Sequence, residues 1–108
     1  MLNNNMVFAD FEKNAVNEAL EKKMNVFVIK VSVDENCILK AARAFLVFKN
    51  LEGHCDIIKS EPSAQDIEDE KFELDFSIVV VTEESYESII GIIKNVSEIK
   101  DAAGEAIT

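Results

Sequence analysis

The sequence has few of the residues that break or cross-link a chain. Its 108 residues include one proline, three glycines, two cysteines, one histidine and no tryptophan. Scarce proline and glycine predict short connections between elements. The cysteines, Cys37 and Cys55, lie eighteen positions apart without a CxxC spacing, which gives zinc or thioredoxin-type chemistry little support. We interpret both as reduced, structural thiols.

Positive charge and long apolar runs are also scarce. Eleven basic residues stand against 21 acidic ones, for a formal charge of −10, so phosphate-rich nucleic acids and anionic lipids are not expected as partners. The longest apolar run is five residues, from Ala44 to Phe48, whereas a membrane span needs about 20. The start, Met1-Leu-Asn-Asn-Asn, has neither the basic segment nor the apolar core of a secretory signal.

Apolar periodicity predicts seven main elements. Helices are expected at about residues 10–23, 37–51 and from residue 82 onward, the last with a buried stripe at Tyr86, Ile89, Ile90 and Ile93. Strands are expected at residues 26–33, 55–60, 72–81 and 96–100. The predicted helix caps are residues 34–36 for the second helix, Thr82 for the third and Ser63 for a single extra turn.

After the first helix this order is βαββαβ, which predicts an α+β, ferredoxin-like fold. We expect a four-stranded antiparallel sheet with two helices on one face, plus the N-terminal helix. The other face needs a cover, either the first helix through Phe8 and Phe11 or another protein, because it carries Val26, Val28, Val79 and Val81. Residues 9–100 are expected to form the domain, and residues 1–8 and 101–108 linkers within a longer polypeptide.

Residues suited to catalysis or to cofactor binding are sparse. His54 follows Gly53 in an expected turn, so we interpret it as a solvated loop residue rather than a general base. The acidic stretch 61–75 lacks the spacing and the glycine of an EF-hand. The fold order is that of acylphosphatases, but the turn Val33-Asp34-Glu35-Asn36 would repel phosphate. We therefore predict no catalytic residue, no metal and no cofactor.

The helix at residues 37–51 is apolar on two sides and contains no acidic residue. At about 100° per residue, Ile38, Ala42, Phe45 and the stem of Lys49 share the side expected to meet the sheet. The opposite side is expected to face outward, where apolar groups beside cations would suit a protein partner. The simpler alternative is solvated charge flanking a core helix. The outward residues are Lys40, Arg43, Ala44, Val47 and Leu51.

Three segments carry a resemblance to a known family. They are Ile38-Leu-Lys-Ala-Ala-Arg-Ala-Phe-Leu-Val-Phe-Lys-Asn-Leu-Glu-Gly, Asp56-Ile-Ile-Lys-Ser-Glu-Pro-Ser and Phe72-Glu-Leu-Asp-Phe. Over residues 25–99 the chain resembles the response-regulator-binding domain of the chemotaxis histidine kinase CheA. The resemblance implies a non-catalytic cytoplasmic domain, flexibly linked to the other kinase domains, that binds CheY and in many relatives the methylesterase CheB. Tethering would raise the regulator's concentration for phosphotransfer.

Carried over by position, the resemblance implies a docking surface at Ala44, Val47 and Val79, with Lys40, Arg43 and Leu51 as neighbours. Two alternatives belong to other classes of protein. One is an ACT-like small-ligand sensor, which shares the βαββαβ order but favours a glycine-rich turn after the first strand. The other is a spacer that self-associates through its valine face.

Overall fold

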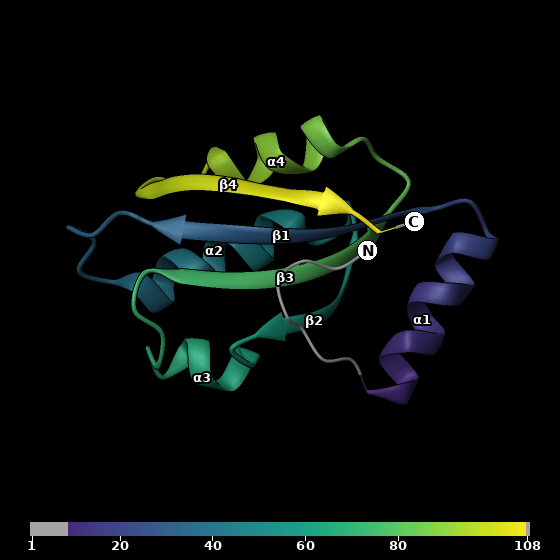
Figure 1. Cartoon of the computed structure of the whole chain (residues 1–108). Coiled ribbons are helices and arrows are strands. Elements are labelled where there is room, and N and C mark those ends of the chain that lie inside the picture. Colours follow the sequence, from purple (N-terminus) through teal and green to yellow (C-terminus); the bar gives the residue numbers. More distant parts are fainter. Residues whose placement is uncertain (1–8, 108) are drawn as a thin grey trace.

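The computed structural model describes residues 9–107 and has the expected order of elements (Figure 1). None of the helices among these residues is long and apolar enough to cross a membrane. The elements are α1 (Asp10–Glu21), β1 (Asn25–Val33), α2 (Lys40–Leu51), β2 (Asp56–Glu61), α3 (Ala64–Glu68), β3 (Asp75–Thr82), α4 (Tyr86–Lys94) and β4 (Ile99–Ala106).

The four strands form one antiparallel sheet in the order β2-β3-β1-β4. The central strands β1 and β3 are the most apolar and the most buried, because both of their faces are covered. Helices α2 and α4 lie on one face of the sheet and α1 lies at the other (Figure 1). The predicted ferredoxin-like fold with an additional N-terminal helix is confirmed.

The main core fills the space between the sheet and the helices α2 and α4. Its fully buried members include Ile29 of β1, Leu51 of α2, Phe76 of β3 and Ile89 of α4. Phe76 also contacts Phe72 and Phe48 with ring centroids 5.7 and 5.8 Å apart, which extends the core toward α3 and adds aromatic pairing to the area buried.

A second, smaller core lies on the opposite face of the sheet. Here Val16 and Ala19 of α1 cover the four valines Val26, Val28, Val79 and Val81. Helix α1 is therefore the predicted cover, although Phe11 is 70% exposed and is not among the residues of this cluster. Phe8 lies outside the described residues.

The final strand begins later in the sequence and is longer than predicted. Strand β4 is Ile99–Ala106 rather than residues 96–100, so residues 101–106, expected to be linker, pair with β1 instead. Small and polar residues with weak strand propensity obscured this strand. Gly104 is required there, because an added Cβ would lie 1.8 Å from the carbonyl oxygen of Val28. The Tyr86 hydroxyl accepts the Gly104 N–H at 2.7 Å and so fixes the strand from its outer edge.

The predicted helix starts differ in accuracy. Ser63 caps α3 by accepting the Asp66 N–H, as predicted. Helix α4 is capped by Ser85 rather than Thr82. Helix α2 begins at Lys40 rather than Cys37, because the Asp34 carboxylate accepts the Asn36 N–H and closes a local turn instead of capping the helix.

Candidate docking surface

Helix α2 presents to solvent the side that was expected to meet the sheet. Ala44, Val47 and Leu51, predicted to face outward, are fully buried in the main core. Ile38 is 86% exposed and Phe45 57% exposed. The predicted orientation of this helix is therefore wrong. Both sides are apolar, and the side with smaller residues packs on the sheet, where Ala44 lets the helix backbone approach closely.

The exposed side of α2 is unusually apolar. We define the α2 stripe as Ala42, Phe45 and Lys49 of this helix together with Ile38 and Leu39, which directly precede it. Leu39 is 61% exposed, and Ala42 and Lys49 are exposed as well. Three of the five large apolar side chains that the described residues expose belong to this stripe. Such a concentration of exposed apolar groups on a helix and directly before it is typical of a protein-binding surface.

The cations of α2 are not equivalent. The Arg43 guanidinium lies 2.8 Å from a carboxylate oxygen of Glu98, before β4, and its Nε is buried without a hydrogen-bond partner among residues 9–107. Arg43 therefore ties α2 to the domain itself. Within the described part of the chain, Lys40 and Lys49 form no ion pair, so their charges are available near the two ends of the stripe.

Val79 is not part of this surface. It is fully buried in β3 with its side chain in the valine cluster under α1, on the opposite face of the sheet from α2. The structure thus brings Lys40 and Arg43 near the exposed stripe, but places Ala44, Val47 and Leu51 in one core and Val79 in the other. The residues missed were Ile38 and Phe45, which the sequence pattern had assigned to the side that meets the sheet, and Leu39, which it had assigned to neither side.

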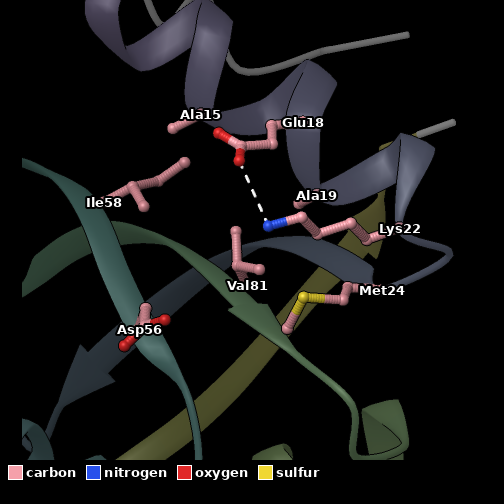
Figure 2. A pocket seen from close by; sticks show the side chains of 8 residues that line it. All are labelled: Ala15, Glu18, Ala19, Lys22, Met24, Asp56, Ile58 and Val81. Atoms are coloured by element: carbon pink, nitrogen blue, oxygen red, sulfur yellow. Dashed lines mark ion pairs between the residues drawn. The ribbon is translucent and has the colours of Figure 1, made fainter.

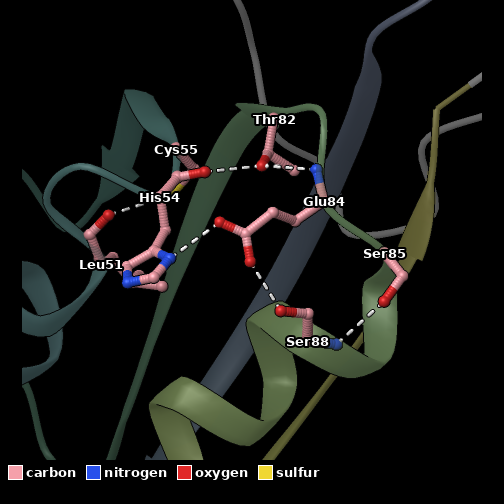
Figure 3. A network of polar contacts seen from close by, with 7 residues as sticks. All are labelled: Leu51, His54, Cys55, Thr82, Glu84, Ser85 and Ser88. Atoms are coloured by element: carbon pink, nitrogen blue, oxygen red, sulfur yellow. Dashed lines mark hydrogen bonds and ion pairs between the residues drawn. The ribbon is translucent and has the colours of Figure 1, made fainter.

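A polar network joins the turn after α2 to the start of α4 (Figure 3). The Glu84 carboxylate accepts the Ser88 hydroxyl at 2.6 Å and lies 2.7 Å from Nδ1 of His54. These contacts lower the pKa of Glu84, the Ser88 hydrogen bond first and the His54 contact second. The Thr82 hydroxyl donates to the His54 carbonyl oxygen at 2.7 Å. His54 is exposed, as expected for a loop residue, but it has a carboxylate partner.

This network lacks an activated nucleophile. The Ser88 hydroxyl donates to the Glu84 carboxylate and not to the imidazole, so His54 is not placed to act as a base on it. Burial raises the pKa of the neighbouring Cys55 thiol to about 11, and Asp56 and Glu84 add to the effect, which keeps that thiol protonated and unreactive. Cys37 is buried, and neither cysteine forms a disulfide. The network therefore fixes the turn after α2.

The described residues also hold a small pocket under α1 and no cluster of three metal-ligating side chains. The pocket has a volume of about 210 Å³ and lies between α1 and the β2 side of the sheet (Figure 2). Ile58, Val81 and Met24 form its apolar part, and the Glu18–Lys22 ion pair of 3.1 Å lies beside it. Small-molecule sites usually exceed about 300 Å³, so we interpret this pocket as imperfect packing of α1.

A ferredoxin-like sheet that carries an exposed, partly cationic apolar helix defines a small protein-docking domain of the α+β class. The family comparison agrees, since the model described as "P2 response regulator binding domain" matches residues 26–105. The chain belongs to this family of P2 domains. Helix α1 precedes the matched residues, whereas β4 falls almost wholly within them.

The relatives are chemotaxis proteins. Chemotaxis protein CheA of Bacillus subtilis is 39% identical over 93 residues, which are 86% of this chain and 14% of that protein. CheA of Listeria innocua is 34% identical over 82 residues, 76% of this chain and 13% of that protein. The chain therefore spans about a seventh of the length of these relatives.

A solved structure shares the fold. It is the CheA P2 domain from Thermotoga maritima, described as in complex with the response regulator CheY. The TM-score is 0.74 at 30% identity, over 78% of this chain and 99% of that domain. The comparisons give no support to the ACT-like alternative.

Proposed function

We propose that this chain is the non-catalytic docking domain of a CheA-type histidine kinase in the cytoplasm, and that it captures a CheY-type response regulator through the α2 stripe. One observation carries the proposal. A chain of the response-regulator-binding family exposes Phe45 on α2 and Ile38 and Leu39 directly before this helix, with Lys40 and Lys49 of the helix beside them.

The physical basis of capture is burial of these apolar groups against the regulator. Exposed aromatic and branched aliphatic side chains at the centre of an interface supply most of its binding free energy. The lysines favour an acidic counterpart and set the orientation of docking. Because α2 carries Lys40, Arg43 and Lys49 and no acidic residue in a chain of net charge −10, an acidic partner is favoured at this helix.

The role within the kinase is positional. A domain held between linkers keeps the bound regulator near the phosphodonor, at an effective concentration that reaches roughly millimolar for short flexible linkers. The domain contributes no group to phosphotransfer. The methylesterase CheB is a second regulator that the same surface would accept if its receiver domain presents a similar face.

A titration of the isotope-labelled chain with purified CheY from the same organism tests this proposal. We expect amide shifts at residues 38–49 and none at Val79 or in α1. Saturation with shifts confined to α1 would contradict the assigned surface, and absence of any shift would contradict regulator docking itself.

A further inference from the structure

A second apolar feature adjoins the α2 stripe. A groove of about 480 Å³ lies between α2, the start of α3 and the outer strand β2. Phe45 and Phe48 of α2, Ile57 of β2 and Ala64 of α3 form its apolar walls. Figure 1 shows α3 directly beside the end of β2, with β2 at the rim of the sheet. The groove is therefore open along the edge of the domain.

Residues of the main core pack against the side chains that form the groove. Phe48 packs against Phe76, and Phe76 against Phe72, in the aromatic part of the main core. Ile57 also packs against this core. Walls fixed in this way need little reorganisation on binding, which lowers the entropic cost of filling the groove.

Phe45 belongs to both features, since it is exposed on the α2 stripe and also lines the groove. A partner seated on the stripe therefore reaches the groove without a gap. We propose that the groove receives one bulky apolar side chain of the docked regulator, which projects from an acidic part of its surface. This inference rests on the proposed function and extends it to a specific anchor.

The chemistry of the groove favours an apolar anchor over a polar metabolite. The ammonium group of Lys59 is directed toward α1, where it lies 3.3 Å from the Glu12 carboxylate. None of the residues that line the groove is acidic, and Lys49 lies one turn from Phe45 on the same helix. Apolar walls with a cation at the rim suit an aromatic or large aliphatic side chain flanked by carboxylates.

Isoleucine methyl groups provide separate reporters for the two surfaces. In the methyl-labelled chain, we expect regulator to shift the Ile38 signal of the stripe and the Ile57 signal of the groove, while Ile92 of α4 stays in place. A shift of Ile38 without Ile57 overturns the groove and leaves regulator docking intact. If neither signal moves, the proposed function fails. If Ile57 shifts with protein concentration alone, a second copy occupies the groove and the inference is wrong.

A groove-filling substitution gives an independent test. Ala64→Trp places an indole at the groove, and Gln65→Trp places one at the next, exposed position of α3 as the matched control. We expect Ala64→Trp to weaken regulator binding at least about tenfold and Gln65→Trp to change it less than about twofold. Since the chain has no other tryptophan, blue-shifted emission of Ala64→Trp verifies that the indole is seated. Wild-type affinity with a seated indole, or an unmoved Ile57 methyl signal, overturns the inference.

Discussion

Phe45 and Val47 lie two positions apart on α2 and have opposite surroundings. Val47 is fully buried against the sheet, whereas more than half of the Phe45 side chain is exposed. Hydrophobicity alone would assign the larger residue to the core. Packing reverses this order, because Ala44 and Val47 fill the space above the sheet while the Phe45 ring lies on the outer side.

This arrangement predicts opposite costs for two truncations. Val47→Ala should lower the free energy of unfolding by about 2 kcal/mol, since it removes buried methyl groups and leaves a cavity. Phe45→Ala should change it by less than about 0.5 kcal/mol, as for most exposed sites. Urea denaturation of both variants provides the measurement. A larger loss for Phe45→Ala than for Val47→Ala would mean that α2 has the orientation first expected from its sequence.

The Glu84 contacts make a prediction about pH. Hydrogen bonds from Ser88 and His54 favour the charged carboxylate and lower its pKa from the ordinary 4.5. Their contribution to stability is thus present above pH 4.5 and is lost as the pH falls through the lowered pKa. Ser88→Ala should move the Glu84 pKa back toward 4.5, as followed by NMR titration of its carboxyl carbon. Ser97→Ala is the control, and an unchanged Glu84 titration in Ser88→Ala would refute the assigned cause.

At the scale of elements, α1 is distinctive because it lies outside the residues matched by the family model yet seals a face of the sheet. It is held by Val16 and Ala19 and by the largely buried Glu12–Lys59 ion pair of 3.3 Å. The pocket that remains beneath it shows that the fit is incomplete. We therefore regard α1 as a cover that keeps an apolar sheet face from other chains.

Removal of α1 should make the domain self-associate. A chain that begins at Met24 exposes four valines on one sheet face and should sediment as a concentration-dependent mixture of monomer and dimer. The matched control lacks only residues 1–8, keeps α1 and should remain monomeric. A chain without α1 that stays monomeric throughout the measured range would show that the valine face needs no cover.

Local sequence patterns predicted most helices and strands. The extent of β4 and the orientation of α2 depended instead on contacts between residues far apart in the sequence. Alternating residues identified β1 and β3, and Ser63 identified the start of α3. The extent of β4 could not be predicted, because its small residues form a strand only where Gly104 crosses closely over Val28. The facing of α2 was likewise undetermined, since a helix that is apolar on both sides has no preferred side until the sheet is in place.

At the scale of the whole molecule, positive charge without neighbouring acids and exposed apolar area coincide at α2 and the residues directly before it. The chain carries ten net negative charges, and the segment from Cys37 to Leu51 contains none of its acidic residues. Within residues 9–107 the other strongly exposed aromatic is Phe11 of α1, in a helix that also carries Asp10 and Glu12. Docking through α2 therefore predicts that two exposed phenylalanines have very different importance for binding.

The most direct measurement is the dissociation constant for a CheY-type regulator, by calorimetric titration, of the wild-type chain, Phe45→Ala and Phe11→Ala. Both variants remove an exposed ring and should stay folded. The account predicts that Phe45→Ala weakens binding at least about tenfold, as expected of a residue at the centre of an interface, while Phe11→Ala binds as wild type. Equal affinity of Phe45→Ala and wild type, or a loss confined to Phe11→Ala, would contradict docking through α2.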